Sequence, residues 1–105
     1  MKVILLYDLD PAWGINEIND TRNSNKVLCE SLQDEGIETY IEELCDPNME
    51  KILERYDPAD TIVFNLCETL PGIPNSEKKV MEILDGSGFT YTGNVPKVIE
   101  LSYDK

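Results

Sequence analysis

Histidine is absent from this sequence of 105 residues, and cysteine occurs only three times, at Cys29, Cys45 and Cys67. Without an imidazole, a Cys/His zinc site lacks its nitrogen ligands, and a cysteine nucleophile lacks a histidine base to generate its thiolate. The odd number and wide spacing of the cysteines argue against a disulfide framework and favour a reducing compartment. The sequence therefore predicts no metal site and no catalytic cysteine.

Basic residues are scarce as well, because nine lysines and arginines stand against 21 acidic residues, for a formal net charge of −12. Such a surface repels phosphate polymers and anionic headgroups, so neither nucleic acid nor a membrane surface is expected as a partner. The apolar run from Val3 to Tyr7 ends at Asp8 and is too short for a signal peptide or a membrane span. These features predict a cytoplasmic protein.

Closely spaced glycines are also missing where a phosphate-binding loop would need them. In such a loop, glycines let backbone N–H groups approach the anion. The segment from Asp8 to Asp20, which follows the first apolar run, contains only Gly14. A dinucleotide site of the usual kind is therefore excluded.

What the chain does contain is an alternation of strand and helix patterns with the length of one domain. Residues 3–7 and 61–66 are apolar runs typical of strands covered on both faces, and residues 37–42 alternate as an edge strand does. Further predictions are helices over residues 25–35, 49–56 and 77–86 and from 96 onward, an extended segment over 89–92, and a glycine helix end at Gly36. The order predicts an α/β fold, a Rossmann-like three-layer domain with a mainly parallel sheet.

Two segments follow the carboxyl ends of predicted strands and are expected to open on one crevice. The first, residues 8–24, is polar and long for a loop of this kind, and the second covers residues 67–74. Asp8 and Asp10 suggest a receiver domain with Mg²⁺, but the strand at 61–66 is not followed by the aspartate that such a site needs. Cys67 is expected to be buried and inert. Trp13 is interpreted either as a contact for a partner domain or as a hydrophobic anchor of its loop.

The second half of the sequence resembles the N-terminal segment of D-alanine:D-alanine ligases and their relatives. The motifs that carry the resemblance are Val63-Phe64-Asn65-Leu66-Cys67-Glu68, a helix with Glu77 near its start, Gly88-Phe89-Thr90-Tyr91-Thr92-Gly93-Asn94, and Leu101-Ser102-Tyr103-Asp104-Lys105. In that family this segment has the pre-ATP-grasp fold and forms the floor of the amino-acid pocket. The resemblance thus implies that residues 1–105 are the N-terminal substrate-side domain of an ATP-grasp ligase whose ATP-grasp domains are absent here.

The resemblance also implies roles for individual residues. Glu17 matches a loop glutamate that receives the substrate ammonium, and Lys105 matches a lysine that reaches the ATP phosphates. Cys67 and Glu68 stand where a typical ligase has histidine and glycine. The residues expected to contact the substrate are therefore Glu17, Cys67 and Glu68, and the substrate itself is expected to differ from D-alanine. ATP and Mg²⁺ would bind in the full-length enzyme, and neither is expected in this chain alone.

Two functions remain open from the sequence. The first is a substrate-binding domain of an ATP-dependent carboxylate–amine ligase, inactive in isolation, with an amino-acid or peptide substrate and the missing ATP-grasp domains as partners. The second is a free-standing acidic α/β binding or interaction module without ligase chemistry. The sequence leaves a homodimer open in both cases. The coding sequence beyond residue 105 would distinguish the two functions.

Overall fold

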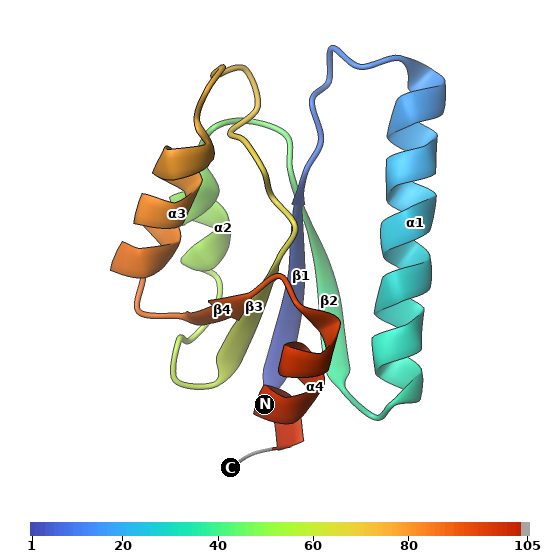
Figure 1. The fold of residues 1–105 in the computed structure, drawn as a ribbon, viewed down its shortest axis with the longest axis vertical. Helices are drawn as coiled ribbons and strands as arrows, with labels where there is room; N and C mark the ends of the chain where they lie inside the picture. Colours follow the sequence, from blue (N-terminus) through green and yellow to red (C-terminus); the bar gives the residue numbers. More distant parts are fainter. Residues whose placement is uncertain (104–105) are drawn as a thin grey trace.

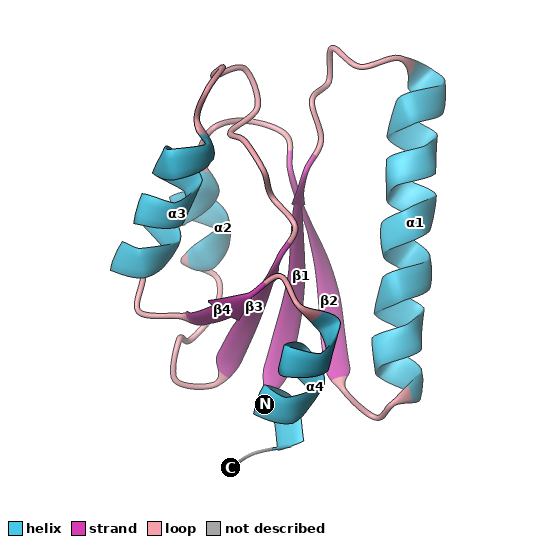
Figure 2. Cartoon of the chain, in the orientation of Figure 1, coloured by secondary structure: helices cyan, strands magenta, loops and turns pink. Residues whose placement is uncertain are grey.

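The computed structural model describes residues 1–103 and shows a parallel sheet between two layers of helices (Figures 1 and 2). The predicted alternation of strands and helices is confirmed. The elements in chain order are β1 (Lys2–Asp8), α1 (Ile15–Asp34), β2 (Glu38–Leu44), α2 (Met49–Leu53), β3 (Thr61–Asn65), α3 (Glu77–Gly86), β4 (Thr90–Thr92) and α4 (Val95–Tyr103).

The sheet contains four strands in the order β2-β1-β3-β4, and every neighbouring pair is parallel. In the register of the central strands, Leu5 lies opposite Ile41 on one side and Phe64 on the other. The predicted α/β class and parallel sheet are thus confirmed. The alternating segment, β2, lies at an edge of the sheet as expected.

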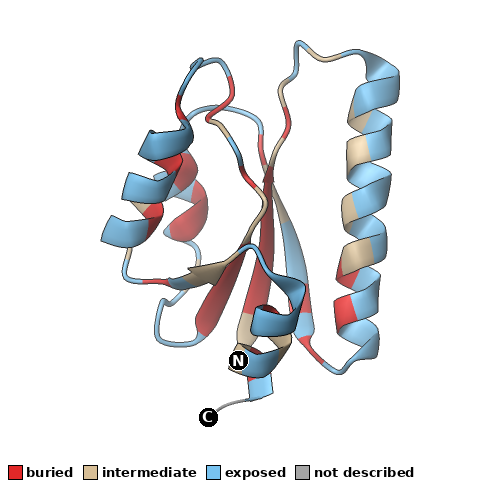
Figure 3. Ribbon diagram, viewed as in Figure 1, coloured by how far each residue is buried: buried red, intermediate tan, exposed pale blue. Residues whose placement is uncertain are grey.

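Each face of the sheet is covered by one pair of helices. On one face, Leu32 of α1 and Val98 of α4 join a buried cluster with Phe64 of β3. On the other face, α2 and α3 supply Ile52 and Leu84, among others, to a second cluster. Figure 3 shows that β1 and β3 are buried along most of their length, which explains their unbroken apolar runs.

Helix α1 begins at Ile15, so the expected long loop over residues 8–24 is wrong. The inward stripe of the helix has helical spacing, but after Ile18 it is interrupted by two polar residues, Thr21 and Asn25, in half-buried positions. Asparagine, aspartate and serine are also frequent there and favour caps and turns over helix interiors. The predicted stripe of Val27, Leu28, Ser31 and Leu32 is only partly right, because Val27 is exposed and the two buried residues of α1 are Cys29 and Leu32.

A polar contact attaches the first half of α1 to the sheet. The Nε atom of Arg22 lies 2.8 Å from a carboxylate oxygen of Glu43 on β2. The hydroxyl of Tyr7 on β1 donates a hydrogen bond to the same carboxylate. The hydrogen bond from Arg22 lowers the pKa of Glu43, so this carboxylate stays ionised. This polar contact adds to the packing of Ile18 against the buried cluster that contains Leu5 and Tyr7.

Gly93 lies where the chain leaves β4, and a Cβ atom there would meet the backbone oxygen of Asn65 at 3.0 Å. We expect Gly93→Ala to lower the free energy of unfolding by about 1–2 kcal/mol, because the strand backbone must shift to admit the methyl group. Gly86→Ala is the matched control, since a Cβ at Gly86 meets nothing within 4 Å. Urea denaturation should show Gly86→Ala to be neutral or stabilising, and equal stabilities of the two variants would contradict the close approach.

Candidate functional site

The sheet has a topological switch point between β1 and β3. The chain leaves β1 for α1 on one face and leaves β3 for α3 on the other face. In open parallel sheets, ligands bind beyond the carboxyl ends of the strands at such a point. A cavity of ≈ 310 Å³ lies there, between the segments that follow β1 and β3. The prediction that these two segments open on one crevice is confirmed, and both lie at the top of the view in Figure 1.

Asp8, the last residue of β1, connects the two walls of this crevice. One carboxylate oxygen accepts a hydrogen bond from the backbone N–H of Glu68 at 3.2 Å. The other accepts one from the hydroxyl of Thr69 at 3.4 Å. Because Asp8 and Thr69 both line the crevice, this contact sets the distance between its walls.

Asp10 and Trp13 form the wall that follows β1. The carboxylate of Asp10 accepts a hydrogen bond from the backbone N–H of Ala12 at 2.8 Å. The backbone carbonyl of Asp10 accepts a second hydrogen bond, from the backbone N–H of Trp13 at 3.0 Å. Trp13 also packs against the buried cluster that contains Leu9 and Tyr7. The interpretation of Trp13 as a hydrophobic anchor is therefore supported, and its half-buried indole also lines the crevice.

The opposite wall is a loop held by Ser76, which is 3% exposed. Its hydroxyl donates to the carbonyl of Ile73 and accepts from the backbone N–H of Leu70, both at 2.7 Å. Between these two residues, Gly72 adopts a φ of 82°, a conformation that glycine takes without steric strain. The loop from Thr69 to Pro74 is thus fixed by its own hydrogen bonds.

The charge of the crevice favours a cation. Its described lining contains the carboxylates of Asp8 and Asp10 and the indole of Trp13, but neither lysine nor arginine. Carboxylates form strong charge-assisted hydrogen bonds with an ammonium group, and an indole face attracts a cation. The volume lies at the lower end of the range for small-molecule sites. The crevice suits a small ligand with an ammonium group.

The residues that the resemblance assigns to the substrate are only partly near this crevice. Glu17 lies exposed in the first turn of α1, not in a loop, and is not a lining residue. Glu68 is exposed and touches Asp8 through its backbone N–H, and Cys67 is its buried neighbour. Lys105 lies outside the described residues. The binding roles of these residues stay predictions.

Asp8 and Asp10 are not among the substrate-binding residues predicted from the sequence. Their position directly after a buried strand of a parallel sheet was the signal that could have identified them, because such positions converge on the ligand-binding edge. The hydrogen bond between Asp8 and the N–H of Glu68 joins residues 60 positions apart. No local pattern in the sequence carries that pairing.

The expected burial of Cys67 is confirmed, since the residue is 5% exposed. Its thiol lies 3.3 Å from the carbonyl oxygen of Thr69 and donates to it. Burial raises the pKa of the Cys67 thiol to about 12, and the negative charges of Asp8 and Glu68 act in the same direction. At neutral pH the thiol therefore keeps its proton and is a poor nucleophile.

The raised pKa of Cys67 predicts a loss of stability in alkali. The folded protein holds the thiol proton up to about pH 12, whereas the unfolded chain releases it near the ordinary pKa of 9.0. Stability conferred by the buried neutral thiol is thus present below pH 9 and is lost as the pH rises toward 12. Urea denaturation should show the stability gap between wild type and Cys67→Ala closing over this range. Parallel curves would show that the thiol does not titrate as described.

Comparison of the chain with protein-family models, with curated proteins and with solved structures found no match.

Within residues 1–103, no three histidine, cysteine, aspartate or glutamate side chains are grouped so that they could hold a metal ion. In the same residues, no helix has the length and apolar composition needed to cross a membrane. The three cysteines are free thiols. The chemistry of the crevice is therefore the main guide to function.

Proposed function

We propose that this chain is the substrate-binding N-terminal domain of an ATP-dependent carboxylate–amine ligase resembling D-alanine:D-alanine ligase, located in the cytoplasm. The observation that carries this proposal is the crevice at the topological switch point, lined by Asp8, Asp10 and Trp13. It suits the ammonium end of an amino-acid or peptide substrate. A substrate domain needs such a site.

The motif that carries the resemblance shapes the backbone of this domain. In Gly88-Phe89-Thr90-Tyr91-Thr92-Gly93-Asn94, Gly88 has a φ of 82° after α3, and Gly93 approaches the end of β3 closely. The side chain of Asn94 then accepts a hydrogen bond from the N–H of Lys97 at the start of α4. The motif thus shapes the path from α3 through β4 to α4. We assign it a structural role, separate from substrate contact.

In the proposed enzyme, the residues of this chain bind and orient the substrate. Asp8 and Asp10 receive the ammonium group, and the exposed Glu68 lies beside the hydrogen-bonded contact with Asp8. ATP and Mg²⁺ would be held by the ATP-grasp domains of the full-length enzyme and would activate a carboxylate as an acyl phosphate there. Within residues 1–103, no three possible metal-ligating side chains are grouped together.

Backbone amide spectra of the isotope-labelled chain test the location of the site. D-alanine and D-alanyl-D-alanine, used as small probes that carry an ammonium group and not as the expected substrate, should give saturable shifts at Trp13, Thr69 and Gly72, because these residues line the crevice. The amides of α4 serve as an internal control. Shifts distributed over the whole chain, or no saturation at high millimolar ligand, would contradict the proposed site.

ATP should not bind saturably to the 105-residue chain at millimolar concentration. The net charge of −12 repels a nucleoside triphosphate, and among residues 1–103 no basic side chain lines the crevice. Isothermal titration calorimetry with ATP and Mg²⁺ checks this expectation. A saturable heat signal would require a cluster of donors that the described lining does not contain.

The coding sequence that follows residue 105 separates the ligase proposal from a free-standing acidic α/β binding module. An in-frame region encoding ATP-grasp domains supports the ligase. A stop codon at that position would favour the binding module, in which the same crevice would bind a ligand without ligase chemistry.

A further inference from the structure

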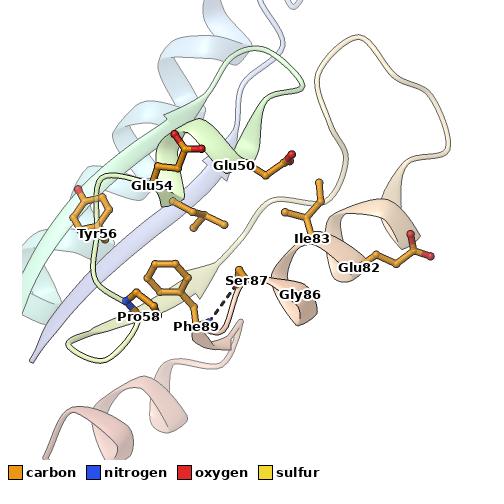
Figure 4. A pocket seen from close by; sticks show the side chains of 10 residues that line it. Glu50, Glu54, Tyr56, Pro58, Glu82, Ile83, Gly86, Ser87 and Phe89 are labelled. Atoms are coloured by element: carbon orange, nitrogen blue, oxygen red, sulfur yellow. Dashed lines mark hydrogen bonds between the residues drawn. The ribbon is translucent and has the colours of Figure 1, made fainter.

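A second and larger cavity lies away from the crevice, between α2 and α3 (Figure 4). Its volume is ≈ 490 Å³, within the usual range for small-molecule sites. Pro58 and Ser87, which line it, precede β3 and β4, so the cavity extends to the amino ends of these strands, whereas the crevice lies at the carboxyl ends. The residues that the following argument uses are Glu50, Leu53, Glu54, Glu82, Ile83 and Phe89.

The floor of this cavity is apolar. Leu53 and Phe89 are buried and belong to the core cluster on this face of the sheet, and Ile83 packs against the same cluster. In Figure 4, the ring of Phe89 and the side chain of Ile83 face the space between the two helices. A hydrocarbon or aromatic group placed here would cover apolar surface that is now open to water.

The rim of the cavity is acidic. Glu50 lies in α2, Glu54 directly follows this helix and Glu82 lies in α3, and among residues 1–103 no lysine or arginine lines the cavity. Within residues 1–103, none of these carboxylates takes part in an ion pair or a side-chain hydrogen bond. The neighbouring Arg55 instead pairs with Glu42 on β2 at 3.0 Å. Three carboxylates around an apolar floor complement a cation that carries an apolar body.

We infer that the cavity between α2 and α3 is a binding site for a small hydrophobic amine with an aromatic or branched aliphatic body. The body lies on Phe89 and Ile83, and the ammonium group lies at the acidic rim to which Glu50, Glu54 and Glu82 contribute. The site does not depend on the proposed ligase function, because it shares no lining residue with the crevice.

Three ligands of similar shape and different charge test this inference. Backbone amide spectra of the whole chain are recorded with 2-phenylethylammonium, 2-phenylethanol and 3-phenylpropanoate at neutral pH. The ammonium ligand should shift Glu54, Ser87 and Phe89 saturably and bind about fivefold more tightly than the alcohol, and the carboxylate should bind more weakly still. Equal affinities for the ammonium and the alcohol would overturn the inference, as would the absence of saturable shifts at these residues.

A pair of variants with equal charge change separates the rim from the general acidity of the chain. Glu50→Gln with Glu54→Gln should weaken binding of 2-phenylethylammonium about threefold. Glu30→Gln with Asp34→Asn removes the same charge from exposed positions of α1 and should leave the affinity unchanged. Equal losses in the two pairs would overturn the inference. Any shifts at Trp13 and Gly72 report on the crevice separately.

Discussion

Replacing Asp8 with asparagine should lower the affinity of the crevice for an ammonium ligand about tenfold or more while leaving the protein folded. An asparagine carbonyl can still accept the hydrogen bond from the N–H of Glu68, and its amide can face the hydroxyl of Thr69. The substitution therefore removes the negative charge and keeps the contact between the two walls. Titration of wild type and variant with D-alaninamide, followed by amide spectra, measures the loss.

Two further variants give this measurement its controls. Asp20→Asn removes one charge from an exposed position of α1 and should leave the affinity unchanged, because Asp20 does not line the crevice. Asp8→Ala breaks the contact between the walls as well, so it should lose binding and also lower the melting temperature. If Asp8→Asn bound D-alaninamide as tightly as wild type, Asp8 would not be the ammonium partner.

Ser76→Ala should destabilise the protein by about 1–3 kcal/mol, because it leaves the backbone N–H of Leu70 without its partner at a buried position. Leu70 is 3% exposed, and its N–H lies 2.7 Å from the hydroxyl of Ser76. The same substitution frees the carbonyl of Ile73. Since these bonds hold the wall that follows β3, binding of ammonium ligands should weaken together with stability.

Urea denaturation measures the cost of Ser76→Ala, and hydrogen exchange at Leu70 locates it. Ser24→Ala is the matched control, because Ser24 is exposed on α1 and alanine is a good helix residue. It should be neutral or slightly stabilising. If the two serine variants had the same stability, the hydroxyl of Ser76 would not be the support of this loop.

The fold was largely predictable because the two central strands have a strong and local signal. Residues 3–7 and 62–64 are apolar on both faces, and the structure covers both faces with helices. The alternating residues of β2 likewise indicated an edge strand. Gly36 ended the first predicted helix at the right place, with a φ of 84° just after the last turn.

The start of α1 was not predictable from apolar spacing, since its first half depends on contacts from other elements. Arg22 is bound by Glu43, which lies 21 positions further along the chain. Thr21 and Asn25 occupy inward positions that a purely apolar stripe would fill. Local propensity in this segment opposed a helix, and the tertiary contacts prevailed.

The candidate site was predictable in position but not in detail. Parallel strands direct their following loops to one edge, so a shared crevice followed from the strand assignment alone. The choice of Glu17 depended on placing it in a loop, and the structure puts it in α1. The Asp8 carboxylate is positioned by hydrogen bonds from the N–H of Glu68 and the hydroxyl of Thr69, and no local sequence pattern predicts these contacts.

The central claim, an acidic crevice that receives a substrate ammonium group, is tested most directly through the fluorescence of Trp13. Trp13 is the only tryptophan and lines the crevice, so its emission reports on occupancy. The chain is titrated with D-alaninamide, D-alanine and N-acetyl-D-alanine, which are a cation, a zwitterion and an anion. The account predicts saturable changes with the amide binding most tightly, D-alanine next and the acetylated acid not at all. Equal binding of N-acetyl-D-alanine and D-alaninamide, or no saturation with any of the three, would contradict it.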